Sequence, residues 1–197
     1  MIRPGQVLTH PLFGTRLTFL HTGAETGGRL LEWETLYKAY RGKESGNTPH
    51  LHVTFVEQYE VLEGMAAYEL KGVVKPAHAG EHVEIPLGTA HRNLWNASAK
   101  DLRLRTHLEM DPPNLPALQF VEDFFQTLYG LARDGKVNAD GLPKSFLHTA
   151  LLVHGFQPDT WVAGTPIPVQ RVLFGALAAL ARARGYRTHY PQYDAQP

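Results

Sequence analysis

Hydrophobic and polar positions follow two different periods along the chain. From Thr15 to about Met110, short runs of alternating apolar and polar residues are separated by Gly, Pro and Asn, a pattern typical of antiparallel strands. The candidate strands are Thr15–His21, Arg29–Tyr37, Leu51–Val56, Gln58–Leu62, Ala66–Leu70, His82–Ile85, Arg92–Trp95 and Leu102–Leu108. Many short strands in so little chain predict a small β-barrel built as a double-sheet jelly roll.

Beyond residue 110 the pattern becomes helical. The segment 111–116 contains three prolines, which cannot donate to a strand ladder, and predicts an extended linker. Apolar residues then recur every three or four positions from Leu118 to Ala132, and Lys144–His154 and the stretch from Pro168 to Gly185 also read as helices. The fold class is therefore mainly β: a barrel domain at 1–110, a Pro-rich linker at 111–116 and a C-terminal extension of about three helices at 117–197.

Charge and composition exclude several classes of partner. The 19 Lys+Arg balance the 19 Asp+Glu, and no basic run provides the face that nucleic acid or an anionic membrane requires. The longest apolar run, Val172 to Ala181, is about half the length of a spanning helix, and the N-terminus does not resemble a signal peptide. We expect a cytoplasmic protein without a membrane span. Because the chain has no Cys, any metal would be held by nitrogen and oxygen.

A His-x-His pair is the first sign of chemistry. Side chains at positions i and i+2 of a strand share a face, so His50 and His52 can reach one ion. Glu57 has the opposite parity and can join them only if the chain bends between Val53 and Val56.

A turn further along the chain supplies a third histidine. Pro86-Leu87-Gly88 is turn chemistry and places His91 at the start of a returning strand. Three imidazoles and one carboxylate suit a divalent first-row metal with one or two positions left for water or substrate.

The two motifs together resemble those of the cupins. The first cupin motif reads Gly, five residues, His-x-His, three or four residues, Glu, six residues, Gly; the second reads Gly, five residues, Pro-x-Gly, two residues, His, three residues, Asn. The matching residues of this chain are His50, His52, Glu57 and Gly64, then Gly80, Pro86, Gly88 and His91. The resemblance implies a barrel with a metal near its mouth, bound at the positions of His50, His52, Glu57 and His91. The ion would be Fe, Mn, Zn, Ni or Co.

This chain departs from the motifs at two positions. The first glycine should fall at Glu44, which Gly42 and Gly46 flank. The final Asn should fall at Trp95, whereas this chain has Asn at position 96. A one-residue bulge would restore the position, or Asn93 could serve, and the sequence leaves both options open.

Five further residues are pocket candidates: Tyr59, Asn93, Trp95, Arg105 and His107. Buried aromatic side chains are more often packing than ligand contacts. Arg105 and His107 alternate with apolar residues, so we expect them to face solvent, although in a hollow barrel the same face could line a cavity and meet an acidic ligand.

Three classes of function remain open. We favour a mononuclear, dioxygenase-like metal-dependent oxidoreductase that acts on a small organic molecule. The sequence thus favours an enzyme but does not decide the question. Within the enzyme class, the same ligands allow a metal-dependent isomerase or epimerase. The second class is a non-catalytic small-molecule-binding cupin, and the third is an interaction protein whose working surface is the helical extension. The expected partner is a small molecule, with a homodimer possible through the helices. Fold alone cannot choose, since one barrel supports many chemistries.

Overall fold

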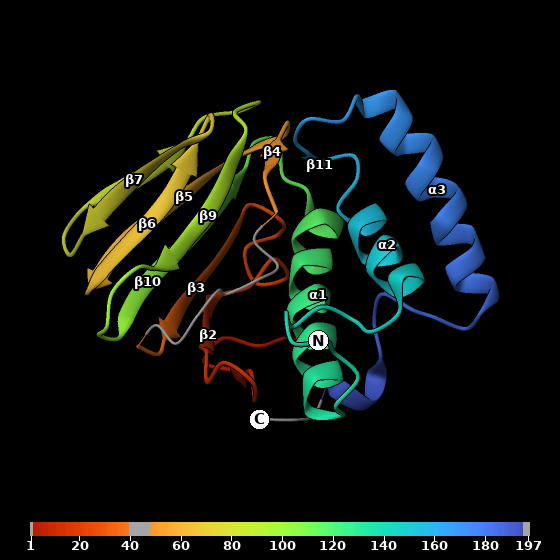
Figure 1. The fold of residues 1–197 in the computed structure, drawn as a ribbon, viewed down its shortest axis with the longest axis horizontal. Coiled ribbons are helices and arrows are strands. Elements are labelled where there is room, and N and C mark those ends of the chain that lie inside the picture. The colour runs from red at the N-terminus through yellow and green to blue at the C-terminus, as the bar shows by residue number, and fades with distance from the viewer. Residues whose placement is uncertain (1, 40–47, 195–197) are drawn as a thin grey trace.

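A computed structural model describes residues 2–39 and 48–194 of the chain. Its elements, in chain order, are β1 (Val7–Thr9), β2 (Arg16–His21), β3 (Leu30–Tyr37), β4 (His50–His52), β5 (Phe55–Glu63), β6 (Met65–Leu70), β7 (Val73–His78), β8 (His82–Ile85), β9 (His91–Asn96), β10 (Leu102–Met110), α1 (Leu115–Arg133), α2 (Phe146–Gly155), β11 (Thr160–Val162), α3 (Ile167–Ala183) and the 3₁₀ helix η1 (Pro191–Tyr193). The predicted class, mainly β with C-terminal helices, is confirmed (Figure 1).

Two antiparallel sheets form the β part. Within the described residues, the six-stranded sheet has the order β1-β2-β3-β10-β5-β8, and the five-stranded sheet has the order β11-β4-β9-β6-β7. Burial alternates along β5, where Phe55, Glu57, Tyr59 and Val61 point inward and the residues between them are less buried. This period of two is the sequence signal that predicted the strands.

The inward side chains form two connected parts of the core. Between the sheets, Val61, Leu102 and Leu104 pack with Leu94 of β9. At the other end of the six-stranded sheet, β2, β3 and β10 share a core with α1, to which the helix contributes Leu118, Val121 and Tyr129. Figure 1 shows α1 lying beside this end of the sheet. The first helix of the extension therefore packs as part of the same hydrophobic core.

The strand boundaries differ from the prediction in two ways. The expected strand Leu51–Val56 is wrong: Val53 and Thr54 interrupt it, so β4 ends at His52 and β5 starts at Phe55. The strands β1, β7 and β11 were missed. Strands β1 and β11 have three residues each, too few for a period to show, and β7 is mostly exposed and contains Pro76.

The C-terminal segment begins earlier than expected and includes a strand. Helix α1 starts at Leu115, inside the predicted linker, with Pro116 in its first turn and the Asn114 side chain accepting a hydrogen bond from Ala117 N at 3.2 Å. Between α2 and α3, β11 pairs with β4. None of the described helices has the length and hydropathy that a membrane crossing demands. The domain boundaries stay a prediction.

Candidate metal centre

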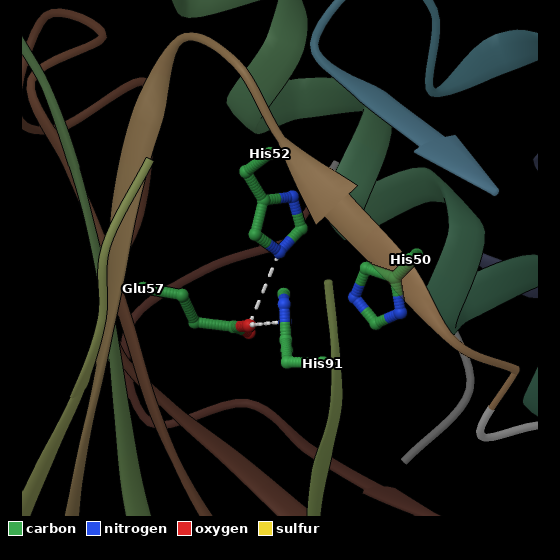
Figure 2. Close-up of side chains that lie close together, drawn as sticks. All are labelled: His50, His52, Glu57 and His91. Atoms are coloured by element: carbon green, nitrogen blue, oxygen red, sulfur yellow. Dashed lines mark hydrogen bonds and ion pairs between the residues drawn. The ribbon is translucent and has the colours of Figure 1, made fainter. Parts of the chain in front are cut away.

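The four residues that the two motifs mark lie together at one end of the two sheets. His50 and His52 come from β4, Glu57 from β5 and His91 from β9, and their ligand atoms all lie within 4.8 Å of one another (Figure 2). His52, Glu57 and His91 are buried and His50 is half-buried. Of the described residues, only these form such a group of possible metal ligands.

The parity problem of Glu57 is solved by a change of sheet. Strand β4 belongs to the five-stranded sheet and β5 to the six-stranded sheet, and the chain crosses between them at Val53 and Thr54. Because the sheets face one another, the inward face of β5 directs Glu57 back toward His52 (Figure 2). The third histidine is positioned by pairing, since His91 lies opposite His50 in the β4–β9 ladder.

Each histidine ring is fixed by a partner on its outer nitrogen. Nδ1 of His50 lies 2.8 Å from the Thr48 carbonyl oxygen, and Nδ1 of His91 lies 2.9 Å from that of Thr89. A carbonyl oxygen only accepts, so in these two rings Nδ1 carries a hydrogen and Nε2 is the nitrogen left to bind an ion. Nδ1 of His52 lies 2.9 Å from a side-chain hydroxyl, that of Thr160.

Glu57 is held in its charged form by its neighbours. Burial acts to raise its pKa, but side-chain hydrogen bonds with His52 and His91 outweigh burial and keep the pKa of Glu57 well below its usual range. The Oε2 atom lies 3.2 Å from Nε2 of His52 and 3.3 Å from Nε2 of His91 (Figure 2). The carboxylate therefore has a negative charge that a cation would meet at neutral pH.

The pKa values of His91 and His50 shift in opposite directions. Burial acts to lower the pKa of His91, but the hydrogen bond and charge of Glu57 raise it above its ordinary value. The pKa of His50 falls to about 4, chiefly because burial disfavours its charge and then because His52 and His91 are close. His50 is thus a neutral imidazole at neutral pH, the form that binds a metal.

The donor set fits a transition metal. Three ring nitrogens and one carboxylate oxygen, gathered in a buried place and oriented by outer partners, meet the ligand count and type expected for Fe, Mn, Zn, Ni or Co.

Two of the five pocket candidates lie beside this cluster. Tyr59 follows Glu57 on the inward face of β5, where burial and the carboxylate raise the pKa of its phenol well above the usual range. Asn93 forms a side-chain hydrogen bond with His91, which contributes to the raised pKa of that histidine.

The register of β9 contains the one-residue bulge that was one of the two options for the motif asparagine. Between β6 and β9, Ala67 pairs with Trp95 but Glu69 pairs with Arg92, so β9 carries one extra residue, a bulge. The bulge turns Asn96 inward: it is 1% exposed and donates to the carbonyl oxygens of Lys38 at 3.0 Å and Lys100 at 2.8 Å. Trp95 is half-buried and lies outside the two main core clusters.

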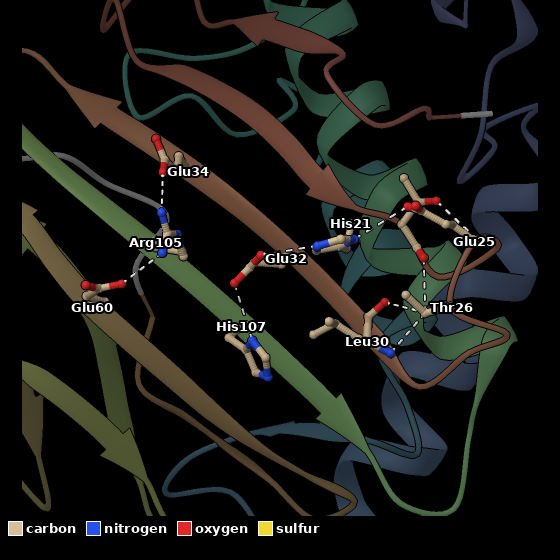
Figure 3. A network of polar contacts seen from close by, with 10 residues as sticks. His21, Glu25, Thr26, Leu30, Glu32, Glu34, Glu60, Arg105 and His107 are labelled. Atoms are coloured by element: carbon tan, nitrogen blue, oxygen red, sulfur yellow. Dashed lines mark hydrogen bonds and ion pairs between the residues drawn. The ribbon is translucent and has the colours of Figure 1, made fainter.

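The other two candidates face away from the cluster. Arg105 and His107 point from the outer face of the six-stranded sheet, where Arg105 pairs with Glu34 at 2.9 Å and Glu60 at 3.1 Å (Figure 3). His107 lies 3.5 Å from Glu32, and these side chains line a surface cavity of about 330 Å³. The structure thus places them as the alternation of β10 predicts, on the polar side.

Sequence reasoning did not single out Thr160 or Phe55, whose side chains both contact His52. Thr160 reaches His52 from β11, in the segment between the expected helices Lys144–His154 and Pro168–Gly185, where no strand was expected. The signal was faint: Thr160-Trp161-Val162 has high strand propensity but only three residues. Gly42, Glu44 and Gly46, at the start of the first motif, lie outside the described residues.

Comparison with known proteins agrees with the fold. No family model and no curated protein matches the chain. Among solved structures, the cupin domain of Schizosaccharomyces pombe Cnp3 is 10% identical, with 54% of this chain and 69% of that chain covered and a TM-score of 0.42. An RmlC-like cupin from Shewanella frigidimarina is 17% identical, covering 54% and 84%, with a TM-score of 0.41. A protein from Thermotoga maritima described as a predicted oxalate decarboxylase is 16% identical, covering 56% and 98%, with a TM-score of 0.44.

These likenesses are likenesses of fold. The chain's own two-sheet architecture brings the residues of both histidine motifs together between the sheets.

Proposed function

We propose that this chain is a metal-dependent enzyme in which His50, His52, Glu57 and His91 hold one divalent transition metal. The observation that carries the proposal is the meeting of four ligand atoms within 4.8 Å of one another, with the outer nitrogen of every histidine already occupied by an oxygen. Such outer partners orient a ligand toward its ion and are the part of a metal site that chance clustering lacks.

The proposed reaction is the oxidation of a small organic molecule by O₂, in the manner of a dioxygenase. Three nitrogens and one oxygen leave one position of a five-coordinate ion or two positions of a six-coordinate ion open, and a bound ion would supply Lewis acidity and redox chemistry there. One carboxylate offsets only part of the charge of a divalent ion. The site therefore favours a substrate with an anionic oxygen, which the residual positive charge would attract.

The residues around the cluster have their own roles in this proposal. Phe55 stacks on His52 at 4.2 Å between ring centroids and shields the imidazole from water. The phenol of Tyr59 is protonated at neutral pH and can donate a hydrogen bond toward the carboxylate end of the site, and burial and Glu57 raise its pKa further.

Metal content is the first test. Protein purified without a metal-affinity tag should contain close to one equivalent of a transition metal, as isolated or after reloading, by elemental analysis. The double variant His50→Ala, His52→Ala should lose it while keeping its circular dichroism spectrum. His82→Ala, which removes an exposed histidine from β8, is the matched control. Less than about a tenth of an equivalent in the wild type under both conditions would end the metal hypothesis.

Oxygen consumption tests the reaction class. The metal-loaded protein should consume O₂ with one class among catechols, diketones and thiols, and the double variant should not. Turnover of an α-hydroxy carbonyl compound without O₂ uptake would instead identify an isomerase or epimerase, and full metal occupancy without turnover of either kind would favour a binding protein. The homodimer and the cytoplasmic location stay predictions, the first of which sedimentation can test.

A further inference from the structure

The ring of His52 is positioned by the C-terminal extension. Its Nδ1 lies 2.9 Å from the Thr160 hydroxyl, across 108 residues of sequence. The other two histidines have backbone carbonyl partners two residues away. Of the three outer partners, Thr160 is thus the one that a side-chain substitution can remove and the one that depends on tertiary structure.

Strand β11 holds Thr160 in register with His52. In the β4–β11 ladder Thr160 lies opposite His52, and Val162 lies opposite His50. Beyond the ladder, Val53 N donates to the Asp159 carbonyl oxygen at 2.9 Å, and the Thr54 hydroxyl donates to Asp159 Oδ1 at 2.6 Å. Elsewhere β4 has the single ladder pair of His50 with His91, and Gly88 N donates to the His52 carbonyl oxygen at 2.7 Å. The short strand that carries two ligands is therefore held mainly by the extension.

The register extends from β11 into α3. Gln170 is 1% exposed, and its side-chain amide bonds both backbone groups of Val162 in β11. Val162 N donates to Gln170 Oε1 at 3.0 Å, and Gln170 Nε2 donates to the Val162 carbonyl oxygen at 2.8 Å. Its Nε2 also donates to the Thr165 oxygen at 2.7 Å. Trp161, 3% exposed, donates from its indole to the Pro158 oxygen at 2.8 Å. These bonds fix the backbone that presents the Thr160 hydroxyl.

We propose that Thr160 is a positioning residue for the metal ligand His52, so that the C-terminal extension is a working part of the metal centre. An imidazole that binds an ion through Nε2 carries its hydrogen on Nδ1 and must donate it. Thr160 Oγ1 accepts that hydrogen and sets the angle of the ring. The inference rests on the proposed metal function of the four ligands.

The test compares metal affinity in two substitutions at one position. Thr160→Val preserves shape and strand propensity but removes the hydroxyl, and should weaken Zn(II) or Co(II) binding about 10- to 100-fold, measured by competition with a chromophoric chelator. Thr160→Ser retains the hydroxyl and should stay close to wild type. The visible absorption of bound Co(II), which reports ligand geometry without turnover, should change in Thr160→Val and be restored in Thr160→Ser.

Controls separate this inference from general destabilisation. Thr127→Val removes a hydroxyl that donates to the Thr188 oxygen at 2.9 Å within the extension, away from the cluster, and should leave metal affinity unchanged. If Thr160→Val does not fold, as judged by its thermal transition, Thr160→Ala removes the same group. Equal affinity in wild type and the variant without the hydroxyl would overturn the inference. No metal binding by wild type would instead contradict the proposed function itself.

Discussion

Burial sets the charge state of individual side chains in this protein, and His10 shows this most plainly outside the candidate metal centre. It is 3% exposed, and neither ring nitrogen has a hydrogen-bond partner among the described residues. Its ring stacks on Phe13 at 4.6 Å and meets the edge of Tyr129 at 5.1 Å. Desolvation lowers the pKa of His10 from 6.5 to about 4. The fold therefore contains this histidine in its neutral form.

We predict that His10 makes the fold acid-sensitive. Below pH 6.5 the unfolded chain takes up a proton that the folded chain accepts only near pH 4, so stability falls as the pH drops through this window. The loss reaches about 3 kcal/mol at its lower end. His10→Leu should flatten this slope in urea unfolding measured from pH 7 to pH 4. His78→Leu, on an exposed histidine, should retain the wild-type slope; equal slopes in all three proteins would refute the prediction.

Within the elements, turns are placed by glycines whose conformation other residues rarely adopt. Gly64, the last residue of the first motif, joins β5 to β6 with φ +88°, and a Cβ there would lie 2.5 Å from the Asp101 carbonyl oxygen. Gly72, between β6 and β7, has φ +79° with nothing within 4 Å of a Cβ. Both glycines have a positive φ angle, but only Gly64 lacks room for a Cβ atom.

Alanine substitutions at Gly72 and Gly64 separate the cost of backbone strain from the cost of a steric clash. Gly72→Ala should cost about 1 kcal/mol, because an L residue must adopt a left-handed conformation. Gly64→Ala should cost at least about twice as much, since the backbone at Asp101 must also shift. Chemical denaturation of both variants measures the two costs. Equal losses would mean that the motif glycine is required for its φ angle alone.

At the scale of the whole molecule, the helices and the sheets depend on one another. Helix α1 buries Leu118 and Tyr129 in the core that Leu17 and Phe19 of β2 form, and β11 extends the five-stranded sheet beside the metal ligands. A protein built in this way should unfold as a unit, because removing one part exposes apolar surface of the other.

Truncation tests that dependence. A chain ending at Pro112 should lose its cooperative thermal transition and its metal binding, since it lacks the helix that covers one end of the sheet and the strand that holds β4. Differential scanning calorimetry and equilibrium dialysis measure both properties. A truncated protein that melts cooperatively and binds metal as the full chain does would show instead that residues 117–197 are an independent appendage.

The sequence predicts those features of the fold and of the candidate site that depend on residues close together in the chain. Alternation revealed the longer strands, because a strand between core and solvent must switch sides at every residue. The spacing of the two motifs selected His50, His52, Glu57 and His91, the group that the folded chain brings together.

Other features depended on parts of the chain that are distant in sequence. The route to Glu57 required two sheets facing each other. The partner of His52 came from a three-residue strand that has no period of its own and forms because β4 offers it a ladder. The sequence by itself determined which four residues gather into the candidate metal site. Only the tertiary structure decided what holds them, because hydrogen bonds between distant segments leave no pattern in either segment alone.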